Sequence, residues 1–269
     1  MAVIKTTEIN SIQGAGAGFT QNLNFGDEKL ESATQLFALG TKGMTPDGRI
    51  FRYAKNSSAA ITTGGQIVEG EAMQANHDMD VPVTGTTAVG STTLSLEVPT
   101  TDLTANEYAD GYIYINDGPG QGEIYRILSH PAHDASDDAT CVFTLDESKG
   151  LKVQATTSTL VGLVYNPYYN VAIIDGDGTR ISRPLGVSTA PVTANYYTWI
   201  QTSGYAAVLA GAAVGVVGDG MKVSQASGES GAADLFDTSA NQDTEPVGTA
   251  VGIAAVATDY QLIDLSIKD

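Results

Sequence analysis

Short runs of β-forming residues recur along most of this chain of 269 residues, with glycine, proline and aspartate between them. The clearest run is residues 92–98, where leucine and valine alternate with threonine, serine and glutamate. Because successive side chains of a strand point to opposite faces, the pattern predicts a strand with one buried face. Many short strands separated by turn residues are typical of β-sandwiches and barrels.

Composition favours the same class of fold. Hydrophobic residues make up 42% and charged residues only 16%, which is too few charges for a helical bundle, and 30 glycines supply turns. We therefore expect an all-β protein, with an extended N-terminal arm followed by short-stranded β-sandwich or barrel modules. The predicted strands are 66–68, 92–98, 111–116, 123–128, 140–145, 160–167, 170–174, 196–201, 206–209, 215–217, 247–257 and 261–267.

An Asp-Gly pair, Asp47-Gly48, joins two further β-type segments, residues 37–44 and 49–55. Asp-Gly supplies the positive φ that a tight turn needs, so the sequence predicts a β-hairpin here. Neither face of its second strand is uniformly apolar. We therefore expect an exposed hairpin whose aromatic side chains are available for contact.

Glycine and proline suggest how the chain divides. Residues 1–26 are too rich in glycine for a helix and predict an arm that becomes ordered only against a partner. Apolar residues at helical spacing predict a short helix at 27–38, and two prolines in 182–195 mark a boundary. The expected parts are an arm with a possible short helix at 1–35, a β-rich domain opening with the hairpin at 36–190, and a C-terminal β module at 191–269.

Charge narrows the choice of partners. The chain has 31 acidic and 13 basic residues, a net charge of −18, so nucleic acid and anionic membranes are expected to be repelled. It contains neither a signal-peptide core near Met1 nor an apolar run of membrane-spanning length, so we expect no membrane partner. Four of the 13 basic residues lie in the hairpin: Lys42, Arg49, Arg52 and Lys55. They indicate either docking onto an acidic partner surface or simply a solvated hairpin in an acidic protein.

Two glycine-containing loops resemble loops that bind phosphate or carry a nucleophile in enzymes. Residues 118–122 superficially resemble a phosphate-binding loop, but a strand follows them where that mechanism needs a helix N-terminus. Residues 228–231, with His77 upstream, resemble the nucleophile loop of trypsin-like proteases but lack the flanking pattern of that family. A β-loop and a polar surface loop are the better interpretations.

The sequence evidence for a metal site or a reactive thiol is equally weak. Two histidines, His130 and His133, precede aspartates at 134, 137 and 138, but Pro131 breaks any helical face, so an exposed turn is favoured. The Asp-Gly repeat at 175–178 lacks the bidentate glutamate of a calcium loop. The single cysteine, Cys141, fits a buried small hydrophobe. We expect no catalytic residue, no cofactor, no metal site and no enzymatic activity.

Four segments carry a resemblance to a known family: Leu39-Gly40 with Pro46 to Lys55, Tyr112 to Gly118 continuing through Tyr125-Arg126-Ile127, Asn166 to Val171, and Trp199 to Gly204. They resemble structural proteins encoded beside the major capsid genes of tailed bacteriophages, and the similarity covers most of the chain after about residue 36. The resemblance implies a capsid decoration (cement) protein that forms homotrimers, binds the major capsid protein on the outer surface of the virion and stabilises the shell.

In that setting, residues 1–55 are expected to face the shell and residues 191–269 to face solvent. Phe19 and Phe25 are the apolar anchors available on the arm, and the four basic hairpin residues are expected to pair with capsid carboxylates. The alternatives are another virion or surface component, such as a head fibre, a tail protein or an adhesin, and, more distantly, a secreted β-fold hydrolase.

Overall fold

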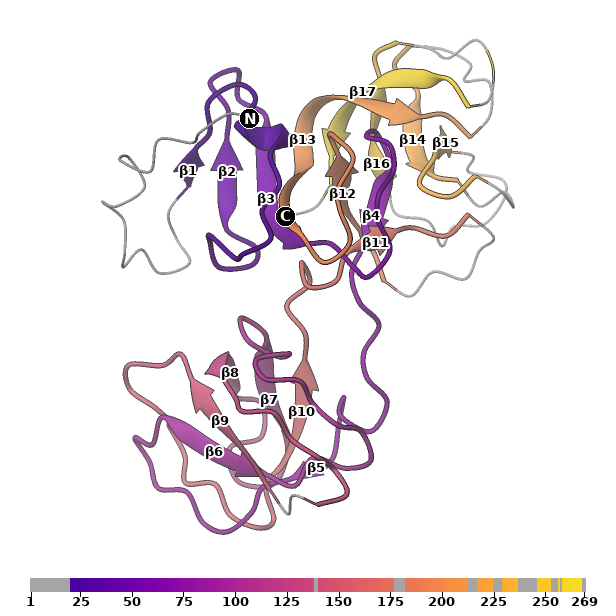
Figure 1. The fold of residues 1–269 in the computed structure, drawn as a ribbon. Coiled ribbons are helices and arrows are strands. Elements are labelled where there is room, and N and C mark those ends of the chain that lie inside the picture. The colour runs from indigo at the N-terminus through magenta and orange to yellow at the C-terminus, as the bar shows by residue number, and fades with distance from the viewer. Residues whose placement is uncertain are drawn as a thin grey trace.

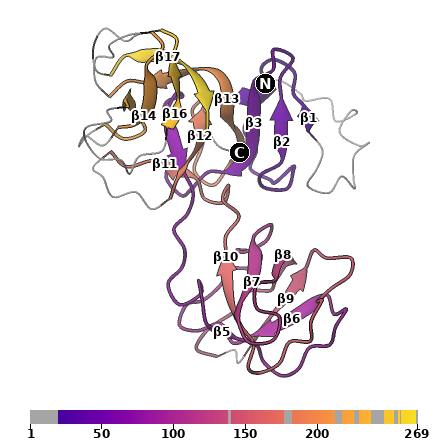
Figure 2. The ribbon, with the colours of Figure 1, turned by 180° about the vertical axis from the view of Figure 1, so that it is seen from behind.

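The structure, a computed structural model, describes residues 20–137, 140–176, 182–211, 217–224, 229–236, 246–252, 256 and 258–267. The regular secondary structure of the described residues is almost entirely β, which confirms the predicted fold class. Figures 1 and 2 show two lobes joined by two neighbouring segments, residues 70–76 and 166–171. We call them the inserted lobe, residues 77–165, and the large lobe, which contains the described residues on both sides of it.

The large lobe is built on one extensive sheet. Its main path runs β1-β2-β3-β13-β17-β16-β14-β15, and β4, β11 and β12 attach beside it through β12–β13 pairing. The strands are β1 (Gln21–Asn22), β2 (Lys42–Met44), β3 (Ile50–Lys55), β4 (Ile67–Glu69), β11 (Ala172–Ile173), β12 (Pro184–Ser188), β13 (Tyr197–Leu209), β14 (Gly220–Val223), β15 (Ala233–Leu235), β16 (Pro246–Ala250) and β17 (Tyr260–Ser266).

The inserted lobe is a six-stranded sheet in the order β5-β10-β7-β8-β9-β6. A bridge between Val83 and Leu96 brings the two ends of this order together, so the sheet nearly closes into a barrel. Its strands are β5 (Val81–Pro82), β6 (Thr93–Leu96), β7 (Tyr112–Asp117), β8 (Ile124–Ser129), β9 (Cys141–Leu145) and β10 (Leu160–Val164).

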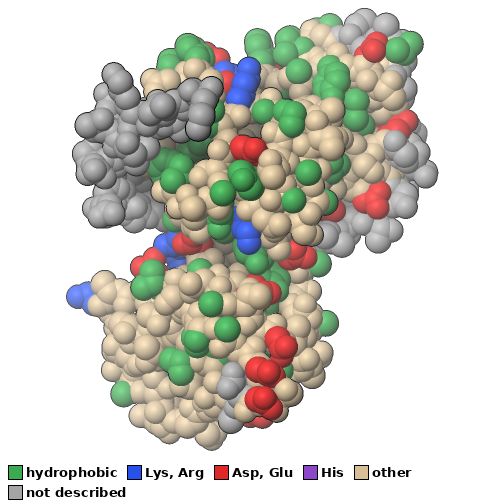
Figure 3. Space-filling model, in the orientation of Figure 1, with side chains coloured by type: hydrophobic (Ala, Val, Ile, Leu, Met, Phe, Trp, Pro, Cys, Tyr) green, Lys and Arg blue, Asp and Glu red, His purple; other side chains and the backbone are tan. Residues whose placement is uncertain are grey.

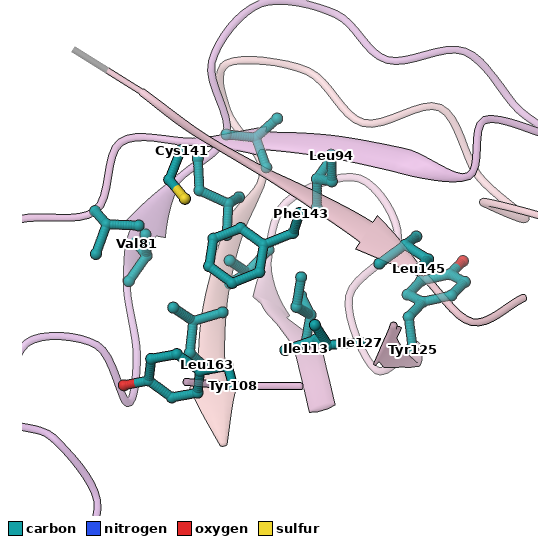
Figure 4. Close-up of a cluster of buried hydrophobic side chains, with 14 of the residues drawn as sticks. Val81, Leu94, Tyr108, Ile113, Tyr125, Ile127, Cys141, Phe143, Leu145 and Leu163 are labelled. Atoms are coloured by element: carbon teal, nitrogen blue, oxygen red, sulfur yellow. The ribbon is translucent and has the colours of Figure 1, made fainter. Parts of the chain in front are cut away.

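The inserted lobe has its own hydrophobic core. Figure 4 shows Phe143 among aliphatic and aromatic side chains that come from several strands. The predicted alternation in β6 is confirmed, because Leu94 and Leu96 are buried while Thr93 and Glu97 are exposed. Cys141 is also buried in this core as a free thiol, as predicted. Two further clusters of buried side chains form the core of the large lobe.

The predicted hairpin exists, but it is not exposed. Strands β2 and β3 pair in antiparallel register, and Gly48 takes a φ of +87° in the turn. However, β3 also pairs with β13, so it lies inside the sheet. Its aromatic side chains Phe51 and Tyr53 are therefore buried, at 0% and 2% exposure, and the expectation that they are available for contact was wrong.

Two predicted strands, 196–201 and 206–209, are one continuous strand, β13. Its pairing with β3 shifts register between Gln201 and Ser203, and Gly204 has a φ of +83°. This irregularity lets the first half of β13 pair with β3 and the second half pair with β17. Gly204, which lies between the two predicted strands, is therefore inside one strand at the point where that strand changes partner.

The helix predicted at 27–38 is absent from these described residues. Only Asp27–Lys29 form a short 3₁₀ turn, and Leu30 is already extended. The side chain of Asp27 accepts hydrogen bonds from Asn24, and Ser32 pairs with Tyr197 of β13. Local polar contacts and pairing to the sheet therefore outweigh the helical spacing of the apolar residues.

Within the described ranges, no helix is long and apolar enough to cross a membrane.

The two lobes divide the chain differently from the predicted ranges 1–35, 36–190 and 191–269. Strand β12 lies in the expected boundary, yet it pairs with β4 on one side and β13 on the other. Proline is tolerated at Pro184 because it is the first residue of that strand.

The N-terminal arm up to residue 19, with Phe19, lies outside the described residues, whereas Leu23 beyond it is buried against the sheet. Of the strand predicted at 215–217, only Val217 is described, and it lies in a turn.

Candidate functional site

The four basic residues of the hairpin do not form one patch. Lys42 and Arg52 are opposite each other on β2 and β3. Arg49 and Lys55 lie at the two ends of β3, which are roughly 20 Å apart at the usual rise of a strand. On the face drawn in Figure 3, Lys and Arg side chains likewise lie at separate places, near the top of the large lobe and around the boundary between the lobes.

Arg49 is occupied by contacts within its own lobe. Its Nη2 lies 3.4 Å from Oε1 of Glu28, whose side chain is only 3% exposed, and its Nε donates to Oδ2 of Asp47 at 2.8 Å. The guanidinium also lies 5.5 Å from the ring centre of Phe51. Arg52 donates from Nη1 to the carbonyl oxygen of Gly40 at 2.9 Å. These two cations therefore help to hold the hairpin and the segment before it.

Lys55 has different surroundings, because the end of β3 reaches the boundary between the lobes. Its backbone is fixed by hydrogen bonds to Tyr168 and Val171, at 2.9 and 2.8 Å. Its Nζ lies 4.7 Å from the ring centre of Tyr169. Burial lowers the pKa of Lys55, and the negative charge of Glu107 offsets part of that effect.

A cleft of about 570 Å³ opens beside Lys55 between the two lobes. The large lobe and the connecting segment 166–171 contribute one wall, and the loop before β7 in the inserted lobe contributes the other. The lining residues are Gln35, Ala38, Leu39, Lys55, Thr104, Ala105, Asn106, Glu107, Ala109, Asp110, Leu128, Tyr169 and Tyr197. The volume lies within the usual range of small-molecule pockets.

Asp110 ties the two lobes together at the base of this cleft. Its Oδ2 accepts hydrogen bonds from Nε2 of Gln35 at 2.9 Å and from the backbone nitrogen of Leu39 at 3.1 Å. Its other oxygen pairs with Arg126 of β8. Asn166 adds to the junction, because its Nδ2 donates both to the carbonyl oxygen of Leu39 and to that of Asp110. We call this set of contacts the Asp110 lock.

Glu107 is also held in place by its own lobe. Its Oε2 accepts from the backbone nitrogen and the hydroxyl of Thr104, at 2.9 and 3.0 Å. Its Oε1 accepts from the hydroxyl of Tyr165 at 3.1 Å. The carboxylates on the walls of the cleft are therefore already bound by neighbouring donors.

A line of aromatic rings runs from the core of the inserted lobe to Lys55. Tyr108 stacks on Tyr165 with ring centres 4.3 Å apart, and Tyr165 stacks on Tyr169 at 5.4 Å. Burial raises the pKa of all three hydroxyls, that of Tyr169 to about 12, so they stay protonated at neutral pH. The rings pack one face of the junction and leave Lys55 at the end of the line.

The histidines are structural parts of the inserted lobe. His77, His130 and His133 are all buried, at 0%, 4% and 3% exposure. His77 contacts the hydroxyl of Tyr108 and the carbonyl oxygen of Pro99, both at 3.0 Å. The segment after His133 is an exposed turn, as predicted, with Asp134 and Asp137 exposed, but the side chains of His130 and His133 are buried and not part of that exposed surface. Among the described residues, no three His, Cys, Asp or Glu side chains are arranged to hold a metal ion.

The other loops singled out in the sequence are tight turns or polar surfaces where the structure describes them. Gly118 has a φ of +79°, and an added Cβ there would lie 2.1 Å from the carbonyl oxygen of Ser158. Ser230 lies 3.4 Å from Oδ1 of Asp175 and accepts from the backbone nitrogen of Gly176. Its supposed partner His77 is engaged in the other lobe, so the structure brings no protease-like triad together at Ser230.

Of the two proposed aromatic anchors, Phe25 is described and is 63% exposed. Asp110 and Glu107, which line the cleft, and Asn166, which bonds across the junction beside it, were not predicted as site residues from the sequence. Asp110-Gly111 and Asn166-Pro167 are visible in it as turn signals, but a turn signal does not show which distant segment the side chain contacts.

Fold and cleft together define an all-β protein of two lobes with a polar cleft between them. Comparison with family models, with curated proteins and with solved structures finds no match to this chain.

Proposed function

We propose that this chain is a structural virion protein that binds the outer surface of a tailed-phage capsid and stabilises the shell. The observation that carries the proposal is the resemblance of four segments to decoration proteins. These segments form the β2–β3 hairpin, the β7–β8 pair, the connection between the lobes and the middle of β13. The resemblance thus covers framework elements of both lobes and not a single short motif.

The charge and surface of the molecule support a binding role. A net charge of −18 favours solubility at high copy number and disfavours nucleic acid as a partner. Exposed apolar side chains such as Phe25, Leu30 and Leu36 lie on the segment that leads into the hairpin and offer a contact surface on that side. We therefore propose the major capsid protein as partner, contacted through this side of the large lobe.

Self-association is part of the proposal. Strand β1 (Gln21–Asn22) ends the main path of the large sheet, and no other strand of the described residues pairs with its outer edge, which makes that edge a candidate for contact with another chain. The resemblance implies a homotrimer. Native mass spectrometry of the free and the shell-bound protein tests this, and a monomer in both states would contradict it.

Co-sedimentation tests the proposed function directly. The purified protein is mixed with shells assembled from the major capsid protein that the proposal expects to be encoded beside it, and bound copies are counted by quantitative mass spectrometry. Saturation at many copies per shell, together with a higher shell melting temperature, is expected. Binding of only a few copies would favour a head fibre or tail component, and an absence of binding would favour an adhesin or another role.

A further inference from the structure

Lys55 is a half-buried cation at the wall of the cleft. Its ammonium lies over the ring of Tyr169, and no carboxylate of the described residues lies within 4.0 Å of its Nζ. Partial burial makes an unpaired ammonium less favourable, and charged groups inside proteins are normally paired. Glu107 acts on this charge only through space, so Lys55 has no directly paired carboxylate as its counterpart among the described residues.

The carboxylates of the cleft do not supply that counterpart. Glu107 is bound by Thr104 and Tyr165, and Asp110 by the lock that joins the lobes. If either carboxylate moved to Lys55, it would give up two or more of these hydrogen bonds. The counterion for Lys55 is therefore expected to come from outside the chain.

Two further donors line the same cleft. The hydroxyl of Tyr197 has no hydrogen-bond partner among the described residues, and the same holds for Nδ2 of Asn106, whose Oδ1 accepts from the backbone nitrogen of His130. With the ammonium of Lys55, the walls thus offer an N–H donor that carries charge and two neutral donors. Such a set suits an oxygen anion with two acceptor atoms.

The charge of the walls limits which anion can enter. The charged lining residues Lys55, Glu107 and Asp110 sum to a net charge of −1, and the whole molecule carries −18, so repulsion grows with the charge of the anion and is strongest for phosphates and polyanions. A carboxylate carries a single charge and places the least negative charge beside them. The cleft is also lined mainly by polar residues, unlike the apolar pockets that bind most small molecules.

We propose that the cleft between the lobes binds one carboxylate, presented by an Asp or Glu side chain of a partner protein, with Lys55 as the pairing cation. The choice of a protein side chain as the source rests on the proposed function, in which the partner is the capsid shell. A bound side chain would contact both lobes at once and so fix their arrangement on the shell.

A peptide titration tests the cleft without any shell. Full-length protein labelled with ¹³C and ¹⁵N at lysine is titrated with acetyl-Gly-Glu-Gly-amide, with the Gln analogue and with sodium acetate, and the lysine Cε signals are followed by NMR. The Glu peptide is expected to shift the Lys55 signal saturably, the Gln peptide to leave it unchanged, and acetate to bind more weakly. Equal responses to Glu and Gln peptides would overturn the proposal. Acetate binding as tight as that of the Glu peptide would overturn the choice of a protein side chain.

Variants locate the effect. Lys55→Met should weaken binding of the Glu peptide about tenfold or more. The physical reason is that loss of a hydrogen bond to a charged group lowers a binding affinity by about that factor. Lys55→Arg keeps the charge and should retain binding. Lys29→Met removes an exposed lysine elsewhere and should change nothing. Circular dichroism and melting temperatures check that each variant folds. Unchanged peptide binding by folded Lys55→Met would overturn the assignment.

The same variants on shells separate this inference from the proposed function. Wild-type protein that binds the Glu peptide but no shell would contradict the decoration role and leave the carboxylate site standing. Wild-type and Lys55→Met proteins that bind shells equally well would contradict the cleft as a contact site and leave the decoration role standing.

Discussion

Arg49 illustrates how a residue chosen for its charge can have a structural task. It pairs with Glu28, which is 3% exposed, and packs on Phe51. Arg49→Ala leaves this buried carboxylate without its cation, so we expect the free energy of unfolding to fall by about 1–3 kcal/mol. Urea denaturation at pH 7 measures the change. The exposed Lys29→Ala variant is the control, and a loss no larger than its loss would show that the pair is unimportant.

The buried histidines make stability depend on pH. Tyr108 donates its backbone N–H to Nε2 of His130 at 2.9 Å, while Nδ1 lies 2.8 Å from the carbonyl oxygen of Pro131, an arrangement that fits only the neutral ring. Burial lowers the pKa of His130 and of His77 below the ordinary 6.5. Well above pH 6.5 both histidines are neutral in the folded and the unfolded chain.

As the pH falls below that value, the unfolded chain binds protons before the folded chain does, so stability must decrease. We expect the free energy of unfolding to decline between pH 7 and the lowered pKa values of His77 and His130. Below those pKa values both histidines are protonated in the folded and the unfolded chain, so they should add no further dependence on pH. Urea denaturation from pH 8 to pH 4.5 measures the curve. A His77→Asn, His130→Asn double variant should show a shallower slope over the same interval, even if its stability is lower throughout. A slope identical to that of the wild type would exclude the two histidines as the source of the pH dependence of stability.

At the scale of elements, the Asp110 lock fixes the segment before β2 to the inserted lobe. Asp110→Ala removes two hydrogen bonds to residues 35–39 and one partner of Arg126. We expect stability to fall by roughly 1–3 kcal/mol and the distance between the lobes to vary more, as measured by small-angle X-ray scattering. The exposed Asp259→Ala variant should match wild type in both. Scattering and stability of Asp110→Ala that match those of Asp259→Ala would show that other contacts hold the lobes.

Sequence patterns predicted elements well where the deciding contacts are local. The alternation in β6 and the Asp47-Gly48 turn are local, and both were found as predicted. The burial of Phe51 depends on pairing between β3 and β13, which are separated by more than a hundred residues, and no local pattern indicates it. The cleft could not be predicted for the same reason, since Lys55 and Glu107 line one cleft only through the arrangement of the lobes.

At the scale of the whole molecule, the structure indicates how many N-terminal residues can be deleted without removing part of the large lobe. Leu23 is buried and β1 pairs with β2, so residues from about 20 onward belong to the large lobe. Deleting residues 1–19 should leave folding intact and sharply reduce shell binding if this segment contacts the shell. Deleting residues 1–26 should also lower the melting temperature. Normal shell decoration by the 1–19 deletion, in the co-sedimentation assay, would show that the segment is not a contact.

The position of the inserted lobe within the chain sets an order for folding. The six strands of this lobe pair only with one another, whereas β4 and β12 of the large lobe must meet across it. If residues 77–165 fold first, their two ends are brought side by side and the loop that β4 and β12 must close becomes effectively short, which lowers its entropic cost. We expect a fragment of residues 77–165 to fold alone with the circular dichroism of a β protein, and the large lobe to form in a later kinetic phase. The insertion would then act as the nucleus that allows a sheet assembled from both halves of the chain to form quickly.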